Sequence, residues 1–219
     1  MLLSVVIPAL NAAATLPATL AALGDVAEVV VVDGGSTDGT PAVARQWGAR
    51  VLTAPRGRGG QIAAGIAASH AAWLLLLHAD TVLQPGWREA AAALMAEGPA
   101  RAGYFRFALD SADPRARRLE RLVAWRCRRF ALPYGDQGLL IARSLLHSAG
   151  GMRPLPLMED VDLVRRLGRK RLRALPASAL TSAGKWQRQG WMRRSARNLA
   201  CLALYLCGVP PRRIARVYE

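Results

Sequence analysis

The segment from Glu28 to Thr40 constrains the fold of this chain more than any other. It reads Glu-Val-Val-Val-Val-Asp-Gly-Gly-Ser-Thr-Asp-Gly-Thr, so a run of valines ends at Asp33 and continues into the pair Gly34 and Gly35. A continuous β-branched run predicts a buried parallel strand, which would carry Asp33 to the carboxyl edge of a sheet, where open α/β folds bind ligands. The two glycines would let the backbone turn sharply and approach a ligand closely. A well-capped turn between a strand and a helix would explain this single segment equally well.

Two further segments repeat the arrangement of an apolar run that ends in polar groups. They are Ser4-Val-Val-Ile-Pro-Ala-Leu-Asn11 upstream and Leu74-Leu-Leu-Leu-His78-Ala-Asp80 downstream. The repetition favours a ligand-binding edge over an isolated turn.

Strands and helices are expected to alternate through the first hundred residues. The expected strands are Leu2–Ile7, Val29–Asp33, Arg50–Thr53 and Trp73–His78. The expected helices are Thr15–Leu23, Thr40–Trp47, Gly60–Ser69 and Trp87–Ala96. This alternation predicts an α/β fold with a mostly parallel, Rossmann-like sheet flanked by helices.

The second half of the chain is expected to contain fewer strands and several basic helices. We expect strands at Ala102–Leu109 and Leu139–Ala142, a helix at Pro114–Phe130, and another helix that begins at Met158-Glu-Asp-Val-Asp162. Three carboxylates at the start of that last helix exceed what capping requires. No internal repeat or linker divides the sequence, so we expect a single domain over residues 1–219.

Charge is distributed unevenly along the chain. Residues 1–100 carry 5 arginines and 7 acidic residues, whereas residues 101–219 carry 25 basic and 8 acidic residues, which gives net charges of −2 and +17. Such a basic half would face something anionic, such as phosphate, acidic lipid or nucleic acid. Only two of the basic residues are lysines, so a GC-rich coding bias is an alternative source of the arginine excess.

The expected helix Pro114–Phe130 and the apolar segment Leu199–Val209 leave membrane contact open. The first interleaves seven arginines with apolar side chains, so it could lie on a membrane, bind an acceptor, or be a solvated helix with a buried stripe. The second, flanked by arginines, could be a core helix or an interfacial one. The three cysteines form no CxxC pair, and no signal peptide or spanning segment is evident, so we expect a cytoplasmic protein with peripheral contact at the inner face of the membrane as an alternative.

Taken in order, the motifs resemble those of the family 2 inverting glycosyltransferases with the GT-A fold. The resemblance covers nearly the whole chain and rests on the opening that ends at Asn11, the turn after Asp33, the strand end at Asp80, and Met-Glu-Asp160. Three segments also resemble sequences of a small bacterial subgroup associated with radical-SAM enzymes and arsenosugar-type biosynthesis. They are Leu-His-Ala-Asp, Tyr-Gly-Asp-Gln and Met-Glu-Asp-Val-Asp.

The resemblance implies a role for most of the polar residues. Residues 1–100 would bind a nucleotide-sugar donor and residues 101–219 an acceptor. Asp33 would bind the base or ribose, Asp80 a divalent cation on the diphosphate, and Asp160 would be the general base. The remaining implied contacts are Pro8, Ala9 and Asn11 in the nucleotide pocket, and Tyr134, Asp136 and Gln137 toward the acceptor.

The chemistry of glycosyl transfer supports several of these roles independently. A diphosphate leaving group needs cations, which Arg56 and Arg58 in a glycine-rich loop could supply. An attacking hydroxyl must lose its proton to a carboxylate such as Asp160 or, as a second candidate, Glu159. Trp186 and Trp191 could stack on a sugar or lie in the core.

The sequence also departs from the family pattern at two positions. Ala12 follows Asn11 where an acidic residue is common, and His78 replaces the first aspartate of the DXD-type triplet that ends at Asp80. A neutral imidazole ligates Mn²⁺ but suits Mg²⁺ poorly, so His78 could be a metal ligand, a phosphate donor or a packed histidine. We therefore expect a divalent cation, Mn²⁺ or Mg²⁺, held by Asp80 with or without His78.

Two other functions remain open at this point. A sugar nucleotidyltransferase would need a glycine-rich loop with Arg and Lys after the first strand, and Asn11-Ala-Ala-Ala-Thr15 has neither. A non-enzymatic basic module that binds lipid or nucleic acid would leave Asp33, Asp80 and Asp160 unexplained. We therefore expect a glycosyltransferase that does not bind nucleic acid.

Overall fold

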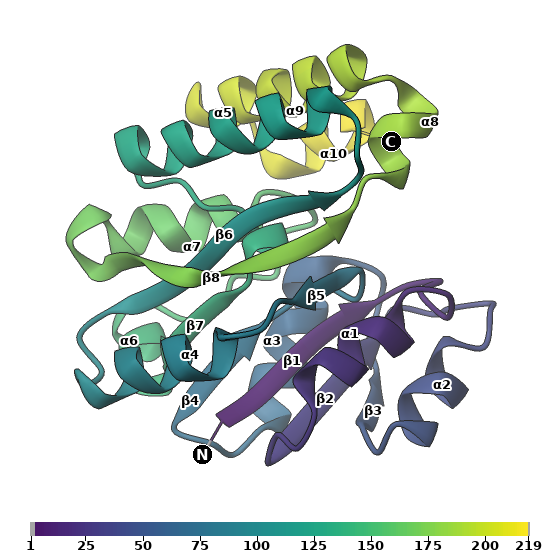
Figure 1. Ribbon diagram of the computed structural model, residues 1–219, viewed down its shortest axis with the longest axis vertical. Helices are drawn as coiled ribbons and strands as arrows, with labels where there is room; N and C mark the ends of the chain where they lie inside the picture. The colour runs from purple at the N-terminus through teal and green to yellow at the C-terminus, as the bar shows by residue number, and fades with distance from the viewer. Residues whose placement is uncertain (1–2, 219) are drawn as a thin grey trace.

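The computed structural model describes residues 3–218, and over this range the strands form one eight-stranded sheet in the order β3-β2-β1-β4-β7-β6-β8-β5 (Figure 1). The strands are β1 Leu3–Ala9, β2 Glu28–Asp33, β3 Arg50–Thr53, β4 Trp73–Leu76, β5 Thr81–Leu83, β6 Ala102–Asp110, β7 Leu139–Ala142 and β8 Leu172–Ser182. The helices are α1 Leu16–Leu23, α2 Thr40–Gln46, α3 Arg58–Ala68, α4 Trp87–Ala96, α5 Pro114–Phe130, α6 Arg143–Ser148, α7 Glu159–Leu167, α8 Gly184–Gln189, α9 Trp191–Leu206 and α10 Pro211–Tyr218, with 3₁₀ turns at Gly135–Gln137 and Arg169–Arg171.

The first four strands in the sheet order, β3, β2, β1 and β4, are all parallel. The valine- and leucine-rich sequences of β1, β2 and β4 are largely buried on both faces, as is typical of parallel sheets, whereas the edge strand β3 is partly exposed. β7 then pairs antiparallel with both β4 and β6, while β6 and β8 are parallel and β5 is antiparallel to β8. The predicted α/β fold with a mostly parallel sheet is confirmed.

Helix α3 packs closely against the centre of the parallel region because it carries glycine at the point of contact. A Cβ on Gly65 would lie 2.4 Å from Val6 Cγ1 and 2.9 Å from Val32 Cγ2. Only a residue without a side chain lets the helix approach β1 and β2 this closely. This packing fixes the N-terminal end of α3 near the carboxyl ends of the same strands.

Beyond the main core, two smaller apolar clusters anchor the C-terminal half. In one, α5 packs over β6 through Ala116, Val123 and Cys127. In the other, α9 and α10 bury Cys201 and Ile214 against the segment that leads into α7. Figure 1 shows α5, α9 and α10 together at one end of the molecule, above β6 and β8 in this view.

Several elements differ from the sequence prediction. β4 ends at Leu76, so His78 lies in the loop beyond the strand instead of at its last position. β5 and the 11-residue β8 were not predicted, and the proline in β8 argues against a strand. β8 accommodates Pro176 at an irregularity, because Tyr104 pairs with Ala174 whereas Arg106 pairs with Ser178.

The apolar segment Leu199–Val209 lies largely within α9. Cys201 and Leu202 are buried, whereas Leu199 and Leu206 are exposed, so the segment is a core helix on one side only. Among residues 3–218, no helix is long and apolar enough to cross a membrane.

Candidate functional site

Two loops at the carboxyl ends of β1 and β2 are joined by side-chain hydrogen bonds. The Asn11 side chain accepts the Thr37 backbone amide at 2.9 Å through Oδ1, and the Asn11 backbone amide donates to Ser36 Oγ at 2.8 Å. The Ala13 amide donates to Asp38 Oδ2 at 3.0 Å. Asn11 itself has φ 50°, a left-handed conformation that asparagine tolerates better than most residues. These contacts make the two loops one rigid platform at the sheet edge.

Asp33 is buried beneath this platform and orients it. Its carboxylate accepts the amides of Gly35 and Ser36, both at 3.0 Å, and the Ser36 hydroxyl. An ionised carboxylate has about four lone pairs, so roughly one remains for a ligand. Pro8 and Ala9 are also buried at the end of β1, where they support the platform from the sheet side.

Gln61 is a site residue that the sequence reasoning missed. Its buried amide donates to the carbonyls of Ala9 at 2.9 Å and Val32 at 2.7 Å, at the ends of β1 and β2. A Cβ on Gly34 would lie 3.0 Å from the Gln61 amide nitrogen, so this glycine is needed for close approach to Gln61. The available signal was a glutamine on the otherwise apolar face of a predicted helix.

His78 and Asp80 lie in the loop that follows β4, and their pKa values are shifted by different causes. Burial, reinforced by the Arg58 charge, lowers the pKa of His78 to about 4, so its imidazole is neutral at pH 7. Burial alone would raise the pKa of Asp80, but the positive charge of Lys185 lowers it below its ordinary value. Lys185 Nζ lies 3.4 Å from Asp80 Oδ2.

Arg58 connects the start of α3 to α7. It stands at the first position of α3, and its Nε lies 3.1 Å from Glu159 Oε1. A Cβ on Gly59 would lie 2.6 Å from the Leu155 carbonyl oxygen, so glycine lets α3 lie directly against the segment that precedes α7. Arg56, by contrast, is exposed in the loop before α3.

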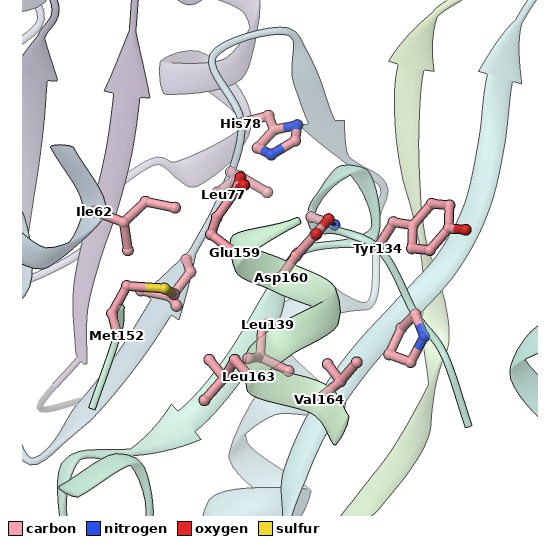
Figure 2. Close-up of a pocket in the computed structure, with 14 residues that line it drawn as sticks. Ile62, Leu77, His78, Tyr134, Leu139, Met152, Glu159, Asp160, Leu163 and Val164 are labelled. Atoms are coloured by element: carbon pink, nitrogen blue, oxygen red, sulfur yellow. Dashed lines mark hydrogen bonds between the residues drawn. The ribbon is translucent and has the colours of Figure 1, made fainter. Parts of the chain in front are cut away.

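The two carboxylates at the start of α7 occupy different environments. Glu159 is 1% exposed, and burial raises its pKa to about 7 despite the nearby Arg58. Asp160 lines a cavity between the sheet edge and the C-terminal helices. Its Oδ2 accepts the Gly135 backbone amide at 2.6 Å, and its Oδ1 accepts the Val161 backbone amide at 2.7 Å. Figure 2 shows His78, Glu159 and Asp160 at one end of an apolar pocket. Met158, with φ 65°, holds this helix start in a left-handed conformation that is typical of functional sites.

The loop between α5 and β7 closes the cavity on a third side. A Cβ on Gly135 would lie 2.5 Å from His78 Nε2, so this glycine allows the loop to contact the imidazole. Asp136 has a buried Oδ1 with no hydrogen-bond partner among the described residues. Burial, together with the negative charges of Asp160 and Asp80, raises its pKa to about 6 although Arg126 opposes the shift.

The C-terminal helices supply the remaining wall, which sequence reasoning identified only in part. A cavity of about 740 Å³, open mouth included, lies between them and the sheet edge. Trp186 lines it with an indole nitrogen that has no described partner. The lining residues from this region that were not predicted are Thr181, Ser182, Lys185, Arg194, Asn198 and Tyr218. Their only sequence signal was the excess of basic residues in this half.

Three predicted acceptor residues have different positions in the structure. Tyr134 lines the cavity, with the Arg126 guanidinium carbon 3.4 Å from its ring centroid. Gln137 is buried, donates to the Phe105 carbonyl at 3.0 Å and accepts the Tyr134 amide at 3.2 Å, so it holds the loop in place. Trp191 is packed in the core beside α5, under the guanidinium of Arg115. Only Tyr134 of these three reaches the cavity.

The cavity brings carboxylates and cationic side chains together. Asp80, Asp136 and Asp160 line it with Arg58, Lys185 and Arg194, and one buried oxygen of Asp136 has no hydrogen-bond partner among the described residues. Within residues 3–218 no three acidic, histidine or cysteine side chains gather closely enough to hold a metal by themselves. A divalent cation held by Asp80 and His78 would therefore need further oxygen ligands from another molecule.

The fold and this cavity define the class of protein as a GT-A-type α/β fold. The crystal structure of S. aureus TarS residues 1–349 superposes with a TM-score of 0.67 at 15% identity and covers 100% of this chain and 69% of that one. Glucosyl-3-phosphoglycerate synthase from Mycobacterium tuberculosis, in complex with Mn²⁺, UDP and glucosyl-3-phosphoglycerate, gives a TM-score of 0.60 at 22% identity over 95% of this chain and 80% of that one.

The family is defined by the sequence itself. Residues 4–155 match the family described as Glycosyl transferase family 2, and the chain belongs to that family. Uncharacterized glycosyltransferases of Mycobacterium bovis and Mycobacterium tuberculosis are 39% identical over 84 residues. That stretch is 38% of this chain and 38% of each relative's length, so the chain matches well under half of these proteins.

Proposed function

We propose that this protein transfers a sugar from a nucleoside-diphosphate sugar to an acceptor hydroxyl, with inversion at the anomeric carbon. The observation that carries the proposal is one cavity at the sheet edge, lined by Asp80 and Asp160 together with the cationic side chains of Arg58 and Lys185. A departing diphosphate needs positive charge, and an attacking hydroxyl needs a base. Both requirements are met within this cavity.

The nucleoside would bind on the platform formed by the two joined loops. Asp33 has a lone pair left for a base or ribose hydroxyl, and Asn11 holds the neighbouring loop in place. Proteins of similar fold support a nucleotide-sugar ligand, since TarS has been crystallised in complex with UDP-GlcNAc and glucosyl-3-phosphoglycerate synthase with Mn²⁺ and UDP. Pro8 and Ala9 would contribute through the shape of the strand end beneath.

The diphosphate would bind between α3 and α8. Arg58 at the start of α3 offers a guanidinium and lies where a helix N-terminus favours anions. Lys185 is held by Asp80 at 3.4 Å and could turn to the phosphate when a cation takes that carboxylate. Asp80 and His78 would hold the divalent cation, which when bound neutralises charge that develops on the leaving group.

Asp160 is the carboxylate best placed to act as the general base. Two backbone amides orient it toward the cavity, and it stands between His78 on the donor side and Tyr134 on the acceptor side (Figure 2). Glu159 is nearly inaccessible and ion-paired with Arg58, so it would position that arginine instead of contacting the acceptor. Inversion follows if the base and the leaving group flank the anomeric carbon on opposite faces.

The acceptor would enter from the side of the C-terminal helices. Tyr134 and Trp186 offer aromatic surfaces for a sugar or other ring, and Asp136 offers a hydrogen-bond partner. Residues 1–100 would thus form the donor half and residues 101–219 the acceptor half of a single domain. Cytoplasmic location and membership of the subgroup associated with arsenosugar-type biosynthesis remain predictions.

The proposal is tested by a screen of sugar nucleotides against the purified protein. Thermal stability and nucleoside diphosphate release are measured with each donor in the presence of Mn²⁺, Mg²⁺ or a chelator. We expect one donor to stabilise the protein and to be hydrolysed slowly when metal is present. Stabilisation that survives the chelator would assign the diphosphate to the basic residues alone. The absence of any response to any donor would contradict the proposal.

A further inference from the structure

Helix α9 presents an apolar stripe to solvent on the side opposite the cavity. Met192 is 85% exposed and Leu199 is 66% exposed, and Leu206 is 48% exposed. Ala196 and Ala203 lie between them and are also exposed. The spacing of four and three residues places all five on one face of the helix. The solvent-exposed face of a surface helix normally carries charged residues, so this apolar face is suited to contact with an apolar surface.

Helix α5 has a second exposed apolar group, surrounded by positive charge. Leu122 is 62% exposed, Trp125 53% and Phe130 51%, and the Trp125 and Phe130 rings meet edge to face with centroids 5.3 Å apart. The buried face of α5 is formed by Ala116, Val123 and Cys127, so Trp125 points away from the core. The exposed arginines around this group are Arg118, Arg121, Arg128 and Arg129.

Both helices lie at the same end of the molecule. Figure 1 shows α5 and α9 at the top of the view, above β6 and β8, and their first turns meet where the Arg115 guanidinium carbon lies 5.7 Å from the Trp191 ring centroid. We call the exposed residues of α5 and α9 named above the α5–α9 face. It combines large apolar side chains, an exposed tryptophan and clustered arginines.

We propose that the α5–α9 face binds the surface of an anionic lipid bilayer as a peripheral contact. Apolar side chains and tryptophan favour the interfacial region, and each nearby arginine adds electrostatic attraction to an acidic leaflet. A second copy of the chain fits poorly, because two such faces would bring like arginine clusters together on a protein of net charge +15. This inference does not rest on the proposed transfer reaction.

Membrane contact would also place the active cavity close to the bilayer. Arg194 and Asn198 line the cavity from the inner side of α9, while Leu199 and Met192 lie on its outer side. An acceptor carried in or on the membrane would then reach the cavity over a short distance.

The test compares binding to vesicles of phosphatidylcholine alone with binding to vesicles that also contain phosphatidylglycerol. The double variant Trp125→Ser with Leu199→Ser removes one apolar anchor from each helix, and both side chains are exposed, so the fold should persist. Trp47→Ser is the matched control, since Trp47 is 49% exposed at the end of α2, in the half of the chain with net negative charge. Circular dichroism and thermal denaturation confirm folding of each variant.

We expect the wild-type protein and Trp47→Ser to sediment with the anionic vesicles only, and less so as salt rises from about 0.05 to about 0.5 M, because salt screens the arginines. The double variant should lose binding by at least about tenfold, the loss expected from removing two interfacial anchors. Equal binding by the double variant, or no binding by the wild type, would overturn the proposal. A dimer that the double variant dissociates, without vesicle binding, would assign the face to a second copy and likewise overturn it.

Discussion

Asp136 provides a pH-dependent test of the electrostatics of the cavity, through the substitution Asp136→Asn. Burial and the neighbouring carboxylates raise the pKa of Asp136 from 3.8 to about 6, and its Oδ1 has no hydrogen-bond partner among the described residues. Ionising this carboxyl group therefore costs more free energy in the folded state than in the unfolded chain. An asparagine has nearly the same shape and cannot ionise, so it removes the cost of charging the group.

The size of the effect follows from the shift in pKa. A raised pKa in the folded state means that the contribution of Asp136 is fully favourable below pH about 4 and is lost as the pH rises through about 6. A difference of about 2 pKa units corresponds to about 3 kcal/mol. Asp136→Asn should therefore be more stable than the wild type by up to about 3 kcal/mol at pH 8, and this advantage should vanish near pH 4.

Urea denaturation of both proteins across this pH range, in the presence of a chelator, measures the difference directly. The matched control is Asp110→Asn, which makes the same chemical change at an exposed aspartate at the end of β6. A constant difference between Asp136→Asn and the wild type from pH 4 to pH 8, or destabilisation at pH 8, would refute the reasoning.

Three further substitutions test how the fold positions the site, each by urea denaturation. Gly65→Ala should destabilise the protein by about 1–3 kcal/mol, because the new Cβ would lie 2.4 Å from Val6 and force α3 away from the sheet; an unchanged stability would contradict the close packing. Gln61→Ala should cost about 1–3 kcal/mol, since it removes two buried hydrogen bonds at the strand ends, although the Ala9 carbonyl keeps the Gly34 amide as a donor; a neutral result would mean that water replaces the side-chain amide. Ala131→Gly should stabilise by up to about 1 kcal/mol, because Ala131 ends α5 with φ 53° and glycine adopts that conformation without strain; a loss of stability would show that the methyl group packs usefully.

The N-terminal part of the fold, from β1 to β4, follows from local sequence because each element there carries its own signal. The valine run before Asp33 favours a strand by its own composition. Of the glycines that follow, Gly35 is required by the turn and Gly34 by the close approach of Gln61. Parallel strands with short loops then place Asn11, Asp33 and the His78–Asp80 loop at one edge. The α/β class and the order of the early elements were therefore predictable.

The C-terminal part of the site was less predictable because its residues meet only through long-range packing. Lys185 lies beside Asp80 across 105 positions of sequence, and nothing near either residue indicates the pairing. β8 was missed because Pro176 argues against a strand, and its tolerance depends on an irregular pairing with β6. Trp191 and Gln137 illustrate the converse, since residue types common in binding sites are used here for packing and for holding a loop.

The most direct test of glycosyl transfer by this cavity compares the wild type with Asp160→Asn. Donor affinity and nucleoside diphosphate release are measured side by side with the donor identified in the screen. We predict unchanged donor affinity and turnover lower by roughly two to four orders of magnitude, the loss expected on removing a general base. Equal turnover by the two proteins would contradict the assignment of Asp160 as the base, and a wild type that releases no nucleoside diphosphate from any donor would contradict sugar transfer by this site.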